Sequence, residues 1–159
     1  MHHFTIKALK KEDLSELLTM LKEFAEYEKK LDYLKCDELK LSNLFLENER
    51  AKAFILREDE KIIGYLIFFY SISSFLGERG IYIEDIYIRE KFRKKGYGSK
   101  VFKFIGELSQ KEKIPMLSWV CLNDNLPGIS FYEKLGATHL KSIRTYRLDG
   151  QNLTKLNDL

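Results

Sequence analysis

Two neighbouring acids and one tyrosine are the side chains of this sequence best suited to moving protons. Glu84 and Asp85 interrupt the apolar run 81–88, where burial makes an unpaired carboxylate costly. Because side chains alternate between the faces of a strand, we expect the two acids to point in opposite directions and at least one to line a polar cavity. Tyr132 follows Phe131, and its phenol is protonated at neutral pH and can donate a proton. The alternatives are a solvated or paired acid and an ordinary core tyrosine.

A basic turn with two glycines follows the same apolar run. Residues 93–98 read Arg-Lys-Lys-Gly-Tyr-Gly, and a helical pattern begins directly afterwards. Gly96 and Gly98 let the backbone approach a ligand closely, and the first turn of a helix leaves several N–H groups unpaired. Such a concave set of N–H groups suits a pyrophosphate. The alternatives are an ordinary helix entry with solvated lysines, and nucleic-acid binding, for which no wider basic face is evident.

The order of the elements predicts an α/β domain with a mixed sheet of six to seven strands and about four helices. Apolar residues at helical spacing predict a helix from residue 13, and Asp37 can cap a second one. Further helices are expected over 101–108 and 129–135, and strands over 4–9, 51–57, 62–70, 81–88, 116–122 and between 138 and 148. The length predicts that residues 1–159 form one domain.

Composition argues against several classes of protein. The chain has 27 basic and 24 acidic residues, and the net charge of +3 is too small to indicate nucleic-acid binding. No apolar run approaches the roughly 20 residues that span a bilayer, and the N-terminus lacks the layout of a signal peptide. The two cysteines and three histidines have no metal-binding spacing. We therefore expect a cytoplasmic protein with no metal and with no membrane or nucleic-acid partner.

Taken together, these motifs resemble the GCN5-related N-acetyltransferase (GNAT) family. Residues 93–98 match in full the family's phosphate motif, Arg/Gln-x-x-Gly-x-Gly/Ala. The run 81–88 resembles the family strand that precedes this motif, and segment 125–137 resembles the family helix that follows it. The Tyr-x-Glu-Asp strand and Ala-Glu-Tyr-Glu at 25–28 most resemble the diamine acetyltransferases, which include spermidine/spermine and thialysine acetyltransferases. The resemblance implies the GNAT fold, acetyl-CoA as cosubstrate, a small-molecule amine as acceptor, and a homodimer.

The resemblance also implies roles for individual residues. Glu84 is expected to act as the base, through one water molecule, and Tyr132 as the acid. Tyr27, Glu28 and Glu84 are expected to face the acceptor. Two strands are expected to splay apart, with the pantetheine arm of the cofactor between them. The residues expected to bind the cofactor are Ile86, Tyr87, Ile88, Arg93, Lys94, Lys95, Gly96, Tyr97, Gly98, Ser99, Asn125, Pro127, Gly128 and Tyr132.

Three positions depart from the pattern of the polyamine enzymes. Ser74 and Leu76 stand where an Asp and a Trp are expected, and Arg144 stands where an acid is expected. A cation at that place would repel a second ammonium group, which favours a shorter amine or an amino acid such as thialysine over a long polyamine. Two other functions stay open: acetylation of a protein N-terminus or lysine, and acyl-CoA sensing without catalysis.

Overall fold

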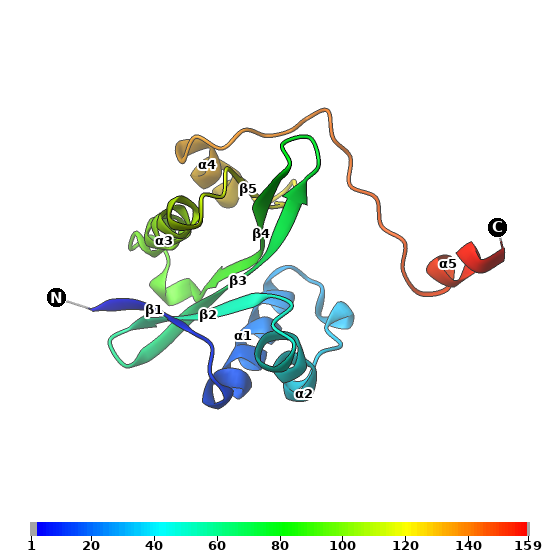
Figure 1. Ribbon diagram of the computed structural model, residues 1–159. Helices are drawn as coiled ribbons and strands as arrows, with labels where there is room; N and C mark the ends of the chain where they lie inside the picture. Colours follow the sequence, from blue (N-terminus) through cyan, green and yellow to red (C-terminus); the bar gives the residue numbers. More distant parts are fainter. Residues whose placement is uncertain (1–2, 159) are drawn as a thin grey trace. The chain divides into compact units, whose positions relative to one another are not determined.

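The computed structural model describes residues 3–158, and Figure 1 shows their path. By its internal contacts the chain divides into two units, residues 1–120 and residues 121–159. The expectation that residues 1–159 form one domain therefore stays a prediction. The predicted α/β class is confirmed, because helices pack on a mixed sheet in the first unit.

The sheet of the first unit has five strands in the order β1-β2-β3-β4-β5. Its first four strands pair antiparallel, and the fifth pairs parallel to the fourth. The strands are β1 (Phe4–Ala8), β2 (Lys52–Glu58), β3 (Lys61–Ser73), β4 (Glu78–Ile88) and β5 (Met116–Ser118). Runs rich in Ile, Tyr and Phe fit this pleated and half-buried surface.

Helices cover both faces of this sheet (Figure 1). The helices of the first unit are α1 (Leu14–Tyr27), α2 (Glu38–Ser42) and α3 (Tyr97–Glu112). Against one face, α1 and α2 enclose a core that includes Leu17 and Tyr65, whereas α3 closes a second core around Phe68 on the other face. The predicted cap of α2 is confirmed, since the Asp37 carboxylate accepts a hydrogen bond from the Lys40 N–H at 2.8 Å.

The second unit contains α4 (Leu126–Lys134) and α5 (Gly150–Thr154). The strands expected between 138 and 148 do not form, so the sheet has five strands rather than six or seven. A strand needs a neighbour that pairs with its backbone, and the second unit has no other strand among its described residues. The strand expected over 116–122 is likewise shorter and ends at Ser118.

Candidate active site

Glu84 lies at an irregularity of β4 that the sequence pattern did not reveal. Ile67 of β3 is opposite Asp85, but the next residue, Phe68, is opposite Ile83. Glu84 is therefore the extra residue of a β-bulge, which breaks the strict alternation that the prediction assumed. The Glu84 side chain is exposed, so its carboxylate is accessible to a water molecule or an amine.

β4 and β5 separate after a short stretch of pairing. β5 pairs with β4 only from Gly80 to Tyr82, whereas β4 continues to Ile88. Within the described part of the first unit, residues 83–88 thus have no neighbouring strand on the side away from β3. An open edge offers backbone groups to an extended ligand. This is the divergence that the resemblance predicts around Ile86, Tyr87 and Ile88.

The side chain of Tyr87 points away from this open edge. Its ring is buried in the core beneath α1, and its hydroxyl donates to Glu23 Oε2 at 3.1 Å. The carbonyl oxygen of Tyr87 lies so close to Gly64 that a Cβ atom there would be 2.1 Å from it. The ring of Tyr87 thus faces α1 and its carbonyl faces β3, so neither faces the open edge, and the cofactor contact expected of Tyr87 stays a prediction. Gly64 allows β3 and β4 to come close together at this point.

The turn from β4 into α3 presents a row of unpaired peptide groups. Lys94 and Gly96 have positive φ angles of 60° and 79°, a conformation that glycine adopts at little cost and lysine does not. Among residues 3–158, no acceptor receives a hydrogen bond from the N–H groups of residues 94–99, and the helical ladder begins with Lys100 donating to Gly96. Several aligned N–H groups at a helix start attract an anion.

Two of the basic side chains around this turn are already engaged. The Arg93 guanidinium donates to the Ile88 carbonyl at 2.8 Å and lies 4.6 Å from the ring centre of Tyr27. Lys95 is 3.4 Å from the Glu58 carboxylate. Arg93 thus joins the turn to the end of α1, which the sequence did not indicate. Arg93 and Lys95 are thus held by contacts within the protein, whereas the N–H groups of residues 94–99 donate to no acceptor among residues 3–158.

Glu58 is a further anchor of the turn that sequence reasoning missed. Its carboxylate is buried at the end of β2 and accepts a hydrogen bond from the hydroxyl of Tyr97, itself buried at the start of α3. Phe4 stacks on the Tyr97 ring with 4.7 Å between the ring centres. Because 39 residues separate Glu58 from Tyr97, no local sequence signal could have paired them.

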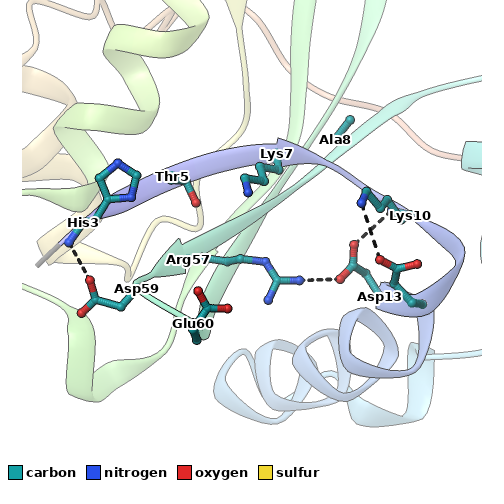
Figure 2. A pocket seen from close by; sticks show the side chains of 10 residues that line it. His3, Thr5, Lys7, Ala8, Lys10, Asp13, Arg57, Asp59 and Glu60 are labelled. Atoms are coloured by element: carbon teal, nitrogen blue, oxygen red, sulfur yellow. Dashed lines mark hydrogen bonds and ion pairs between the residues drawn. The ribbon is translucent and has the colours of Figure 1, made fainter.

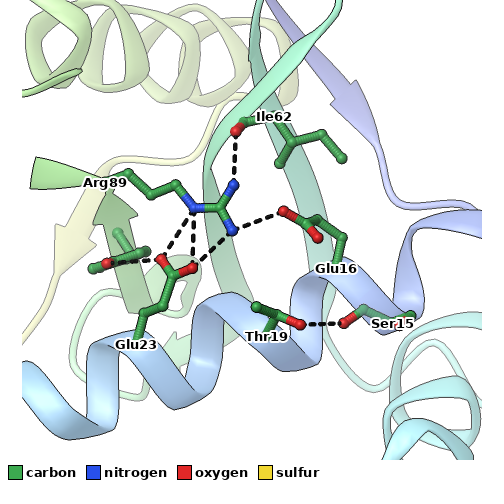
Figure 3. A network of polar contacts seen from close by, with 7 residues as sticks. Ser15, Glu16, Thr19, Glu23, Ile62 and Arg89 are labelled. Carbon is green, nitrogen blue, oxygen red and sulfur yellow. Dashed lines mark hydrogen bonds and ion pairs between the residues drawn. The ribbon is translucent and has the colours of Figure 1, made fainter. Parts of the chain in front are cut away.

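A cluster around Arg89 fastens α1 to the end of β4 (Figure 3). The Arg89 guanidinium contacts Glu23 at 2.8 Å and Glu16 at 2.7 Å, and donates to the Ile62 carbonyl at 3.1 Å. Its hydrogen bonds lower the pKa of Glu23. Burial and the bond to Glu23 raise the pKa of Tyr87 to about 12. Every charge in this cluster has a partner.

The acceptor residues expected on α1 lie at its C-terminal end. Tyr27 is half exposed against Arg93, and Glu28 pairs with Lys30 at 3.0 Å. Asp85 is close to Glu28, and burial, the Glu84 charge and the Glu28 charge raise the pKa of Asp85 to about 7. The structure therefore brings the ends of α1 and β4 together into an acidic region.

The remaining predicted residues belong to the second unit. The Asn125 side chain caps α4 by accepting a bond from the Gly128 N–H at 3.2 Å, and Pro127 lies in the first turn. Tyr132 is half-buried on the same helix, and burial followed by the nearby Cys121 thiol raises the pKa of its phenol. Because Glu84 belongs to the first unit and Tyr132 to the second, their joint action stays a prediction.

A separate hollow lies along β1 and β2, at the opposite edge of the sheet from β5 (Figure 2). Its charged groups are largely paired with one another. Arg57 meets Asp13 at 2.7 Å, and the backbone N–H of His3 donates to Asp59 at 2.8 Å. This pairing identifies the hollow as part of the scaffold.

Among residues 3–158, no group of three or more His, Cys, Asp or Glu side chains is arranged to hold a metal ion. None of the helices described has the length and apolar character required to cross a bilayer.

The chain is similar over its whole length to known acetyltransferases. A thialysine N-epsilon-acetyltransferase of Caenorhabditis elegans is 29% identical over an alignment of 161 residues, which covers 99% of this chain and 99% of that protein. The corresponding protein of Sus scrofa is 28% identical, with 95% of each chain covered. An L-ornithine N5-acetyltransferase of Arabidopsis thaliana is 35% identical over 101 residues, which are 64% of this chain and 44% of the plant protein.

Solved structures share the fold at low sequence identity. An integron cassette protein from V. cholerae superposes with a TM-score of 0.81 at 22% identity, over 98% of both chains. A ribosomal-protein-alanine N-acetyltransferase from Brucella melitensis gives 0.76 at 20% identity, over 92% of this chain and all of that one. The profile of the Acetyltransferase (GNAT) family matches residues 12–137. The chain is thus an acetyl-transferring enzyme and belongs to the GNAT family, whose cosubstrate is acetyl-CoA.

Proposed function

We propose that this enzyme transfers an acetyl group from acetyl-CoA to a primary amine of a small diamine or lysine analogue. The observation that carries the proposal is the row of N–H groups over residues 94–99, which donate to no acceptor among residues 3–158 and lie one short turn beyond the open edge of β4. A pyrophosphate suits the N–H groups, and an extended amide-containing arm suits the strand edge. The acidic side chains of α1 and β4 favour a cationic acceptor. Two of the relatives are named as acetyltransferases of ornithine and of thialysine, which are both cationic amines.

The reaction has two proton transfers, and we assign one to each unit of the chain. Alkyl ammonium groups have a pKa near 10, so the acceptor must lose a proton before its nitrogen can attack. Exposed Glu84 takes that proton through a water molecule. The C–N bond forms as the C–S bond breaks, and the departing thiolate takes a proton from the Tyr132 hydroxyl, whose raised pKa keeps it protonated at neutral pH. The amide nitrogen then releases its extra proton to water, and the Tyr132 oxygen takes a proton back from water.

Release of free thiol from acetyl-CoA, measured across a panel of amines, amino acids and peptides, tests this function. Tyr132→Phe is expected to retain acetyl-CoA affinity while kcat falls roughly 10²-fold or more, because one acid–base group contributes about that much. Gly98→Val is expected to lose acetyl-CoA binding itself, because its methyl groups would cover the N–H surface. Binding without turnover on every acceptor would contradict the proposal and favour a sensor, and turnover of peptides alone would favour a protein acetyltransferase.

The same panel tests the preference among small amines. Ser74, Leu76 and Arg144 replace groups expected in the polyamine enzymes, and a cation at position 144 disfavours a long chain with several ammonium groups. We therefore expect thialysine or ornithine to be acetylated with a higher kcat/KM than spermidine. A higher value for spermidine would contradict this preference.

We also propose a cytoplasmic homodimer. Four large apolar side chains are exposed within segment 138–148, namely Leu140, Ile143, Tyr146 and Leu148. Such a segment, which the sequence predicts to be strand, gains both backbone pairing and apolar burial on association. The sequence has only two cysteines, which lie far apart in the chain, and this composition favours a reducing compartment. Light scattering on the purified protein is expected to give the mass of two chains, and a monomer at micromolar concentration would contradict the dimer.

A further inference from the structure

A hydrogen bond between a tyrosine and a glutamate ties helix α3 to the sheet at each of its two ends. At the last residue of the helix, Glu112 accepts from the hydroxyl of Tyr70 in β3 at 3.0 Å, and this bond is partly exposed. At the first residue, the Tyr97 hydroxyl donates to Glu58, the last residue of β2. Glu58 and Tyr97 are only 5% and 6% exposed. Because burying a carboxylate is costly, this second bond indicates a role beyond fastening the helix.

Tyr97 lies in the middle of the glycine turn. Gly96 and Gly98 flank it, and neither has a side chain that could hold the backbone in place. Gly96 also has a positive φ angle of 79°, so the chain turns sharply just before Tyr97. The N–H groups on both sides of Tyr97 belong to the row over residues 94–99 that donates to no acceptor among residues 3–158. The Tyr97 side chain, bonded to Glu58, is therefore the tether of this part of the row.

The charges around Glu58 allow an anion to bind nearby. An uncompensated carboxylate beneath the turn would repel a phosphate group. Here the Tyr97 hydroxyl directs its proton at the carboxylate, and the Lys95 ammonium lies 3.4 Å from it. The bond to Glu58 raises the pKa of Tyr97 to about 12, so the hydroxyl keeps this proton at neutral pH. Glu58 can thus hold the turn while its own charge is offset.

We propose that Glu58 and Tyr97 are positioning residues, which hold the N–H groups of residues 94–99 in the arrangement that binds the diphosphate of acetyl-CoA. This rests on the proposed function, in which those N–H groups hold the diphosphate, and adds the side chains that keep them aligned. A donor surface that is already ordered loses little conformational freedom when the ligand binds, and so binds it more tightly. Without the bond between Tyr97 and Glu58, acetyl-CoA would have to order a turn that contains two glycines.

Two conservative variants test the bond itself. Tyr97→Phe removes only the hydroxyl and keeps the ring that stacks on Phe4. Its Kd for acetyl-CoA, measured by calorimetry without an acceptor, is expected to rise about tenfold, the effect of one lost charge-assisted bond. Its kcat at saturating acetyl-CoA and its KM for the acceptor amine should change less than about twofold, because the lost order affects cofactor binding rather than chemistry. Glu58→Gln keeps an oxygen that can accept from Tyr97, so its Kd should stay within about threefold of the wild type.

Tyr70→Phe is the matched control, because it removes the same kind of bond from the other end of α3. Like Tyr97→Phe, it should lower the free energy of unfolding measured by urea denaturation. Unlike Tyr97→Phe, it should leave the Kd for acetyl-CoA within about twofold of the wild type, since the Tyr70 bond does not hold the turn. The comparison separates a loss of helix stability from a loss of order in the N–H row.

The outcomes distinguish this proposal from the one on which it rests. A wild-type protein that does not bind acetyl-CoA contradicts the proposed function. An unchanged Kd in Tyr97→Phe, or an equal rise in Tyr70→Phe or Glu58→Gln, contradicts the positioning role and leaves the proposed function standing. In that case Glu58 and Tyr97 only stabilise the packing of α3.

Discussion

Two polar clusters lie beneath α1 on the same face of the sheet, and they differ in how well their groups are satisfied. In the first, Arg89 binds Glu23, which also accepts from the Tyr87 hydroxyl. In the second, the Tyr65 hydroxyl has no hydrogen-bond partner among residues 3–158, and the half-buried Asp85 lies near the like charges of Glu84 and Glu28. The two tyrosine rings are neighbours, with 5.8 Å between their centres, so the contrast arises within one small part of the core.

The pKa directions show what each cluster does for the fold. Hydrogen bonds from Arg89 lower the pKa of Glu23, so its ionised form stabilises the native state. Burial among other acids raises the pKa of Asp85 to about 7, so its ionised form destabilises that state. A cluster whose charges are paired stabilises the fold, whereas a cluster with an unsatisfied hydroxyl and like charges costs stability. Three predictions test this distinction.

The largest loss of stability is expected from Arg89→Ala. Two acids, Glu16 and Glu23, would lose their shared cation and the Ile62 carbonyl would lose a donor. For this partly buried cluster we expect the free energy of unfolding to fall by roughly 2–3 kcal/mol, measured by urea denaturation. Arg79→Ala is the matched control, because that arginine is more exposed and its ion pair with Glu112 is longer, at 3.6 Å, so the loss should stay below about 1 kcal/mol. Equal losses would mean that the Arg89 cluster is not a special part of the scaffold.

The second prediction compares how the stability contributed by Asp85 and by Glu23 depends on pH. Asp85 has its pKa raised from 3.8 to about 7, so its contribution to stability falls as pH rises from about 4 to 7 and stays low above that. Asp85→Asn should therefore be more stable than the wild type at pH 8 by roughly 1–3 kcal/mol, and the gain should disappear near pH 4. Thermal unfolding at several pH values measures this.

Glu23→Gln should show the opposite dependence on pH. The pKa of Glu23 is lowered from 4.5, so the stability that it contributes is present at neutral pH and is lost as pH falls through the lowered value. The cost of Glu23→Gln should accordingly be greatest near pH 7 and shrink in acid. Parallel pH profiles for the two variants would contradict the distinction between the clusters.

Local patterns predicted much of the fold and one part of the site. Alternating apolar runs located β2 to β4, the helical spacing located α1 and α3, and the Asp37 cap formed as expected. The glycine turn also lies where the motif requires, between β4 and α3. These features depend on residues close together in the chain, which is why a single sequence can reveal them.

The features that the sequence did not predict depend on contacts between distant residues. The bulge at Glu84 is a property of how β3 and β4 pair, and the anchors Glu58 and Arg89 bind residues far along the chain. The strand expected between 138 and 148 is absent. Residues that favour an extended backbone form a strand only where a second strand is available to pair with them. Only tertiary packing reveals that the Tyr65 hydroxyl is buried without a hydrogen-bond partner among residues 3–158 and that Asp85 lies near Glu28.

The smallest and most specific effect is expected from removing one hydroxyl from each neighbouring tyrosine. Tyr87→Phe loses the bond to Glu23 and should lower the free energy of unfolding by about 1 kcal/mol. Tyr65→Phe removes a buried hydroxyl without a partner, so stability should stay the same or rise by about 1 kcal/mol, because no bond is broken and a desolvated group is lost. Denaturant titrations of both variants measure the difference, and an equal loss would mean that the Tyr65 hydroxyl is satisfied in solution.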